Sequence, residues 1–237
     1  MTPPFNRRYF FIDTETSALK GRVCELAVVE TDVTGTVLHA AASLIDPEEK
    51  ISPEAMGVHH ITDQMVATEP TLAEYFGMHG RFLASEGAVY IGHNVGFDID
   101  TIARHSLDFL SPTHERACTL RLAKAQWANG EVANHKLQTL RYQFGLNAGS
   151  AHRALGDTLA TVNLALLLCR LNNTNLDGLI ELNRRPVSPT ARITFGKYKD
   201  KDNGKGVRYC DLPKDYVAYL RRQSDLNPDV REVLAQL

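Results

Sequence analysis

The segment Tyr9-Phe10-Phe11-Ile12-Asp13-Thr14-Glu15-Thr16 carries the strongest structural signal in the sequence. Its first four residues are large and apolar, belong to types that are common in strands, and are not interrupted by a polar residue. Such a run predicts a central strand that is covered on both faces and ends in Asp13. A strand of this kind is typical of α/β proteins, in which helices pack on both sides of the sheet.

The flanking sequence predicts four more strands. Residues 23–31 and 37–45 are rich in strand-forming residues and are joined by a turn at Thr34-Gly35, so the first three strands form a meander. A helix predicted at residues 155–171 is apolar around most of its circumference, and a helix predicted at residues 137–144 ends at Gly145. Shorter strands are predicted at residues 88–92 and 116–119, and helices at residues 97–110, 137–144 and 155–171.

Composition divides the chain into two parts. The interleaved strands and helices predict an α/β domain over residues 1–183, and Pro186, Ser188 and Pro189 mark a linker. The formal net charge is −2, yet residues 184–222 hold eleven Lys or Arg against four Asp or Glu. This local excess of +7 leaves −9 for the rest of the chain. We therefore expect a cation site in the acidic domain and phosphate contacts in the basic segment 184–237.

The bulk composition describes an ordinary globular protein. With 237 residues, 43% hydrophobic and 23% charged, the chain can form one large core and an appendage. No stretch approaches the roughly 18 apolar residues of a membrane span, and residues 1–8 lack the apolar core of a signal peptide, so we expect a cytoplasmic protein without a membrane partner. The cysteines show no C-x-x-C spacing and are interpreted as reduced packing residues: Cys24, Cys118, Cys169 and Cys210.

Three short motifs place acids where strands and helices meet. Asp13 and Glu15 are two residues apart, so in an extended backbone their carboxylates project to the same side and repel each other unless a cation lies between them. Asp98 follows a predicted strand at the start of a helix, where ligands bind in α/β sheets. Asp157 lies near the start of an apolar helix, five residues after His152, and a carboxylate buried there needs a partner.

Each motif has a simpler explanation when it is taken alone. Two acids at a strand end can be solvated surface groups, and an aspartate near a helix N-terminus is stabilised by the helix dipole without a metal. A single histidine is more often structural than catalytic, and this chain has nine. Taken one at a time, the motifs leave these alternatives open.

The motifs resemble those of the DEDD superfamily of 3′ to 5′ exonucleases, in the subclass with a histidine before the last aspartate. Asp13 and Glu15 match its first motif, Asp98 in an N-x-x-F-D context matches the second, and His152 with Asp157 in H-R-A-x-x-D matches the third. This resemblance implies a ribonuclease H-like fold, a mixed five-stranded sheet flanked by helices.

Similarity extends beyond the acids to most of the chain. Residues 55–62 resemble a further family segment, and residues 194–198 and 212–220 resemble the C-terminal module of bacterial exodeoxyribonuclease X enzymes. The resemblance therefore implies a small basic C-terminal module. Basic and aromatic residues at 192–199, 201 and 205–208 suit phosphate binding and base stacking, or form a solvated charged face.

The resemblance also implies a two-metal mechanism of phosphodiester cleavage. Two Mg²⁺ ions are expected, with Mn²⁺ as a substitute, because four carboxylates supply hard oxygen ligands. Asp13, Glu15 and Asp157 would hold one ion, Asp13 would bridge to the second, and Asp98 would act mostly through water. His152, with an unperturbed pKa of about 6.5, is assigned as the general base.

The residues after the first motif are candidate contacts to the terminal nucleotide. Leu19 either packs against a base or wedges beneath a terminal pair, or it is a buried core leucine, and the sequence allows both interpretations. Ala18 stands where the family often has glycine, which leaves the shape of this loop open. The nucleic-acid contacts expected from the resemblance are Thr14, Thr16, Leu19, Lys20, His59, Asn94 and Phe97.

DNA 3′ ends are the expected substrate, and a homodimer is among the assemblies considered. An RNA exonuclease of the ribonuclease T or oligoribonuclease type shares the same five residues. A polymerase proofreading subunit would need a partner-binding tail, whereas this C-terminal segment is basic. A silent nucleic-acid-binding module has no need of all five residues, and a small-molecule phosphoesterase has little use for a basic arm.

Overall fold

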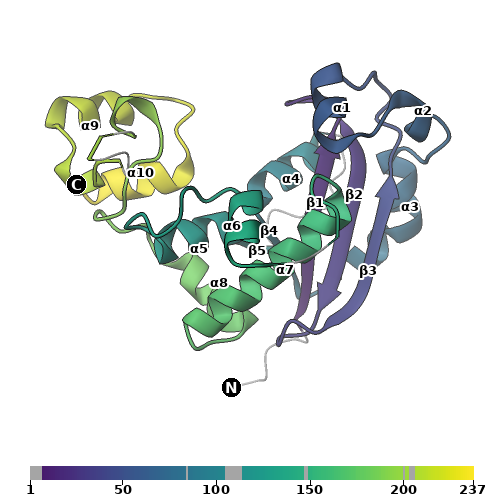
Figure 1. Ribbon diagram of the computed structural model, residues 1–237, viewed down its shortest axis with the longest axis horizontal. Helices are drawn as coiled ribbons and strands as arrows, with labels where there is room; N and C mark the ends of the chain where they lie inside the picture. The colour runs from purple at the N-terminus through teal and green to yellow at the C-terminus, as the bar shows by residue number, and fades with distance from the viewer. Residues whose placement is uncertain (1–6, 84, 105–113, 147–148, 200, 203–205) are drawn as a thin grey trace.

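The centre of the protein is a mixed five-stranded sheet in the order β3-β2-β1-β4-β5 (Figure 1). The computed structural model describes residues 7–83, 85–104, 114–146, 149–199, 201–202 and 206–237. β1 and β3 each pair antiparallel with β2, whereas β1 pairs parallel with β4 and β4 with β5. The strands are β1 (Arg8–Thr16), β2 (Val23–Thr31), β3 (Val37–Leu44), β4 (Ala88–Gly92) and β5 (Glu115–Cys118).

Helices cover both faces of this sheet and form the end of the chain. The expected α/β sheet is confirmed, although only α4, α6 and α7 correspond to helices predicted from the sequence. The described α-helices are α1 (Pro53–His59), α2 (Asp63–Val66), α3 (Leu72–Leu83), α4 (Val95–Ala103), α5 (Thr119–Gln126), α6 (Leu137–Gln143), α7 (Ala154–Leu171), α8 (Leu176–Arg184), α9 (Lys214–Arg221) and α10 (Pro228–Ala235), with 3-10 turns at η1 (Gly196–Tyr198) and η2 (Tyr209–Asp211).

The apolar run in β1 serves two cores. Tyr9 and Phe11 pack with α7 and α8 on one face of the sheet, and Phe10 and Ile12 pack with α3 and α4 on the other. Because side chains alternate along a strand, a continuous apolar run is what a strand buried on both faces requires. The same alternation directs Asp13 and Glu15 toward the face that carries α7.

Element boundaries differ from the predictions at functional positions. β1 does not end at Asp13 but continues through Thr16, so both motif acids lie within the strand. α4 begins at Val95, before Asp98, and the last residues of the helix predicted at 97–110 lie outside the described residues. The turn at Thr34-Gly35 is confirmed: Gly35 has a φ of 88°, and a Cβ there would lie 2.2 Å from the Leu166 side chain.

α7 corrects one expectation drawn from composition. It is the one described helix long and apolar enough to cross a membrane, whereas no such stretch was expected. Most of this helix is nevertheless buried, because it packs against β1 and β2 as the central helix of the larger core. All four cysteines are free as expected, but Cys210 is exposed and is not a packing residue.

The end of the chain forms a small module with its own apolar cluster. Ile193, Tyr209, Tyr216, Leu220 and Val233 are all buried there, on η2, α9, α10 and the loop before them. Figure 1 shows this module beside α5, at one end of the molecule. We define residues 191–237 as the C-terminal module.

Candidate active site

Two acids of the first motif and the acid on α4 converge at the carboxyl end of β1. Thr14, which lies between Asp13 and Glu15, donates its backbone N–H and its hydroxyl to Asp98 Oδ1 at 3.0 and 2.8 Å. Thr14 and Asp98 are both buried. Thr14 therefore positions the Asp98 carboxylate, and its expected contact with nucleic acid stays a prediction.

Asp157 completes the group from the first turn of α7. The side chain of Gln138 donates to Asp157 Oδ1 at 2.7 Å, and Arg141 lies 3.4 Å from the same oxygen. The backbone N–H of His152 donates to Asp157 Oδ2 at 3.1 Å. The partner expected for a buried carboxylate at this position is therefore present, and three groups supply it.

Carboxylate oxygens of Asp13, Glu15 and Asp157 all lie within 4.8 Å of one another. Burial, followed by the negative charges of Asp98 and Glu15, raises the pKa of Asp13 well above its ordinary value. Burial and the charge of Asp157 raise the pKa of Glu15 to about 7, and burial raises that of Asp98 to about 7. Acids that repel each other this strongly fit a divalent cation, which prefers oxygen ligands and would neutralise them.

His152 stands at the rim of this cluster, on the turn before α7. Its backbone has a φ of 56°, in the left-handed region. The side chain is exposed, and within the described residues it makes no hydrogen bond or ion pair. Burial raises the pKa of Asp157 above its ordinary value, and the hydrogen bonds from Gln138 and His152 oppose this rise in part. The imidazole is therefore free to meet a substrate or a water molecule.

Glu25 is a further buried acid beside the site, which the sequence analysis did not single out. It lies directly opposite Glu15 in the β1–β2 register, and its charge contributes to the raised pKa values of Asp13 and Glu15. Arg153 contacts both Glu25 oxygens, the shortest contact being 2.6 Å, and the N–H of Ala154 donates to Glu25 at 2.8 Å. Glu25 thus anchors the turn between His152 and α7. In the sequence, Glu25 could have been noticed as an acid within an otherwise apolar predicted strand.

A tight loop follows the first motif. Ser17 N–H donates to the Arg22 carbonyl at 2.8 Å, and Gly21 N–H donates to Ala18 at 2.9 Å. A Cβ on Gly21 would lie 2.1 Å from Ser17 Oγ, so glycine is required there for close approach. The backbone of Ala18 is not left-handed, so alanine is accommodated without strain.

The loop presents one large apolar side chain to solvent. Leu19 is 86% exposed, so the interpretation of Leu19 as a core leucine is wrong. Lys20 beside it is also exposed, whereas the Thr16 hydroxyl donates to the Ala18 carbonyl at 2.8 Å. Leu19 and Lys20 are therefore the accessible members of this group of expected contacts.

The other expected contacts differ in accessibility. His59 is buried: its Nδ1 accepts from Ile61 N–H at 3.0 Å, so Nε2 carries the proton and donates to the Thr16 carbonyl at 3.2 Å. His59 therefore stabilises the start of the loop through its hydrogen bond to the Thr16 carbonyl. Asn94 is exposed in a left-handed conformation with a φ of 81°, and Phe97 is half-buried next to Asp98.

A family model described as Exonuclease matches residues 10–165, a span that contains all five motif residues. The chain belongs to the Exonuclease family. This exonuclease is 30% identical over 230 residues to exodeoxyribonuclease 10 of Escherichia coli K12, with 94% of this chain and 95% of that protein covered. It is also 33% identical over 157 residues to the epsilon subunit of DNA polymerase III of Treponema pallidum, covering 64% and 72% of the two chains.

Solved structures share the fold of this exonuclease. Exonuclease X in complex with 5′ overhanging duplex DNA matches with a TM-score of 0.60 and 27% identity, over 74% of this chain and 99% of that chain. Escherichia coli exonuclease I in complex with a dT13 oligonucleotide matches with a TM-score of 0.62 and 20% identity, over 70% and 43% of the chains. The first match leaves about a quarter of this exonuclease uncovered.

Proposed function

We propose that this exonuclease removes nucleotides one at a time from the 3′ end of DNA and releases nucleoside 5′-monophosphates. The observation that carries the proposal is the convergence of Asp13, Glu15 and Asp157 within 4.8 Å. Three buried or half-buried acids at such distances repel one another, and a pair of Mg²⁺ ions is the partner that best explains them. Asp13, Glu15 and Asp157 would hold one ion, and Asp13 and Asp98 would serve the second.

Bound divalent cations would stabilise the negative charge that develops on the phosphoryl group during cleavage. The residues of the chain perform the remaining tasks. His152 accepts the proton of the attacking water, because its imidazole is exposed at the rim of the carboxylate cluster. Gln138 and Arg141 orient Asp157, and Thr14 orients Asp98. Leu19 contacts the base of the terminal nucleotide or wedges beneath it.

Two comparisons support DNA as the substrate. Exodeoxyribonuclease 10 resembles this exonuclease over nearly its whole length, and its name specifies DNA. The structure of exonuclease X holds duplex DNA with a 5′ overhang, in which the recessed strand ends in a 3′ terminus. We also propose a cytoplasmic location, since all four cysteines are free.

A product ladder tests the proposal directly. DNA and RNA oligonucleotides with the same sequence and a 5′ label are incubated with the purified protein and Mg²⁺, with and without EDTA. Stepwise shortening of labelled DNA that stops in EDTA is expected. Release of the labelled 5′ nucleotide as the first product would contradict the direction, and preferential shortening of RNA would assign the enzyme to RNA.

A further inference from the structure

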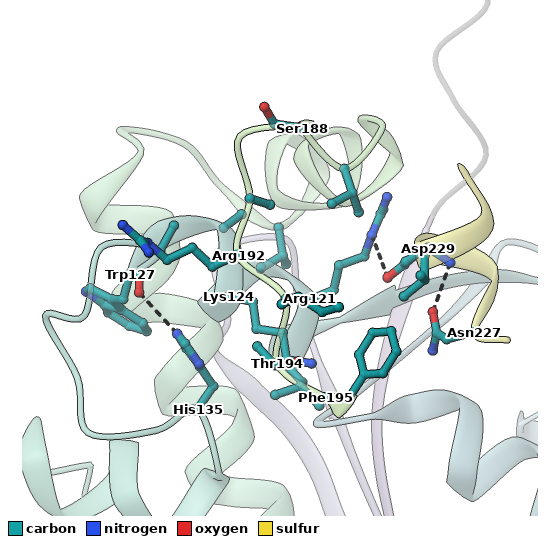
Figure 2. Close-up of a pocket in the computed structure, with 18 of the residues that line it drawn as sticks. Arg121, Lys124, Trp127, His135, Ser188, Arg192, Thr194, Phe195, Asn227 and Asp229 are labelled. Atoms are coloured by element: carbon teal, nitrogen blue, oxygen red, sulfur yellow. Dashed lines mark hydrogen bonds and ion pairs between the residues drawn. The ribbon is translucent and has the colours of Figure 1, made fainter. Parts of the chain in front are cut away.

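A large cavity separates the exonuclease domain from the C-terminal module. It has a volume of about 1920 Å³ and is lined by α5, the loop at residues 127–137 and the module. Figure 2 shows Lys124, Trp127 and His135 from the first two elements, with Thr194 and Phe195 from the module, around this space. We call this cavity the module groove.

The charged side chains of the module groove are predominantly basic. They include seven Lys or Arg against two Asp, in a chain whose formal net charge is −2. The acids are Asp225 and Asp229. The cations are Arg121, Lys124, Lys136, Arg185, Arg192, Lys199 and Arg208.

Two of these cations are engaged in holding the structure together. Arg121 lies 3.1 Å from Asp229, and Arg192 lies 2.5 Å from Asp202. The other five are exposed and form no ion pair within the described ranges of the chain. The two lining acids therefore leave a surplus of positive charge in a concave site, where the fields of several cations add.

The module groove begins where the catalytic site ends. β1, β4 and β5 are parallel, so their carboxyl ends meet at one edge of the sheet, and Asp13 and Glu15 lie there on β1. The next positions along this edge, His93 and Asn94 after β4 and Cys118 at the end of β5, line the groove. Lys136 and Leu137 line it as well, directly before Gln138, which bonds Asp157. The acidic site and the basic groove therefore lie next to each other along this edge of the sheet.

The groove also offers apolar surface suited to bases. Phe195 lines it, and so does Tyr219, whose side chain is 48% exposed. Tyr219 is stacked on Tyr216 with ring centroids 5.7 Å apart, which fixes its plane. Exposed aromatic rings among cations are the combination that single-stranded nucleic acid binds without regard to sequence.

We propose that the module groove binds the single-stranded stretch of nucleic acid that leads to the 3′ end held at the carboxylates. Lys124, Arg185 and Arg208 contact its phosphates, and Phe195 and Tyr219 contact its bases. This inference rests on the proposed function, because the strand enters the groove from the catalytic site. It assigns the C-terminal module to substrate binding at nucleotides remote from the scissile bond.

Two variants with equal loss of charge test the proposal. The groove variant combines K124A, R185A and R208A. The control variant combines R170A, K214A and R222A, three exposed cations that do not line the groove and form no ion pair within the described part of the chain. Binding of a 25-nucleotide DNA strand to the full chain in EDTA is measured by fluorescence anisotropy at several salt concentrations. Cleavage of this strand and of a trinucleotide is then measured in Mg²⁺.

The groove variant is expected to bind the long strand on the order of tenfold more weakly, and the slope of log K against log salt should fall by about 2, since each lost contact removes roughly 0.7. Its ratio of kcat/KM for the long strand over the trinucleotide should fall in the same proportion. The control variant should match the wild type. Equal behaviour of the two variants would overturn the proposal, as would weakening that is the same for both substrates.

The trinucleotide separates this proposal from the proposed function. If the wild type shortens the trinucleotide in Mg²⁺ while the groove variant keeps full affinity for the long strand, the exonuclease stands and the groove has another occupant, such as an acidic protein segment. If the wild type cleaves neither substrate, the proposed function fails first. Binding of the long strand in EDTA still reports on the groove in that case.

Discussion

The carboxylate site and the module groove hold charges of opposite sign in opposite ways. At the carboxylate site, acids are buried close together, and their mutual repulsion raises their pKa values. In the groove, five of the seven cations are exposed, and the two that are half-buried, Arg121 and Arg192, are paired with acids. Buried charges of one sign that lie close together destabilise the folded protein until a ligand of opposite charge binds, whereas solvated charges do not. The difference indicates that the first region binds a small ion and the second a long polyanion.

The largest effect is expected from D13N, which removes one charge from the crowded region. Turnover should fall on the order of a thousandfold or more, because the Asp13 carboxylate, which would hold divalent cations, loses its charge and one of its two oxygens. In EDTA the same variant should be more stable than the wild type by about 1 kcal/mol, since repulsion is relieved. Steady-state cleavage and thermal unfolding check the two parts. D100N, an exposed acid on the same helix as Asp98, is the control and should change neither.

H152G should lower kcat by roughly 100-fold, because the proposed general base is lost. Glycine accepts the φ of 56° at this position, so the turn and the bond from its N–H to Asp157 are kept. The thermal shift produced by Mg²⁺ should therefore remain. His60, which is exposed with a φ of 62°, offers the matched control H60G. A loss of the metal-dependent shift in H152G would assign His152 a structural role.

Glu25 of the carboxylate region is paired with Arg153 at 2.6 Å, and E25Q tests whether this pairing matters. Release of Arg153 should loosen the turn that carries His152 and lower kcat about tenfold, with little change in KM. The double variant E25Q/R153K should be no worse than the more affected single variant, because both lose one shared interaction. E30Q serves as control, since Glu30 is a buried acid of β2 paired with Arg8 at 2.7 Å, away from the site. Equal kcat losses in E25Q and E30Q would contradict the positioning role.

The smallest effect concerns stability without metal. Glu15 and Asp98 have ordinary values of 4.5 and 3.8 and a pKa of about 7 in the folded protein, so they bind protons more tightly when folded. Their contribution to stability is fully present below pH 4 and is lost as the pH rises through about 7. His93 acts oppositely: burial lowers its pKa from 6.5 to about 4, so its contribution is lost as the pH falls through that range.

The expected outcome is a melting temperature in EDTA that falls by a few degrees from about pH 6 to pH 8. Mg²⁺ should remove most of this fall, because a bound cation keeps the acids ionised without repulsion. D13N should flatten the profile in EDTA. Thermal unfolding across this pH range gives the measurement, and a profile that is flat in the wild type would break the contrast drawn between the two regions.

The parts of the site that lie close together in sequence were predictable. A continuous apolar run followed by D-x-E predicted β1 and the direction of two carboxylates, and the motif order predicted that Asp98 and Asp157 would join them. Glu25 was missed because its place in the site depends on the register of β2 against β1, which pairs it with Glu15. Gln138 and Arg141 reach Asp157 from α6 through tertiary packing, which no local pattern reveals.

The C-terminal module shows a different limit of sequence interpretation. Its mixture of aromatic and basic residues suggested stacking on bases, but Phe195 and Tyr198 are half-buried, because both pack against the module core. Lys197 lies about 5 Å from the ring centres of Tyr198 and Tyr216, so part of the basic charge also rests on the protein itself. Composition gave the kind of residue present, but burial decided which residues remain available to a ligand.

Arg121 links the C-terminal module to the exonuclease domain through contacts that depend on salt. Its guanidinium donates to the Arg185 carbonyl at 2.8 Å and reaches Asp229 and Glu232 on α10, so one side chain fastens the tail of the protein to α5. Such surface pairs weaken as ionic strength rises. The contacts of Arg121 with α10 therefore weaken under the same salt conditions that weaken the binding of a polyanion. Salt is expected to change the position of the C-terminal module as well as the affinity of the module groove.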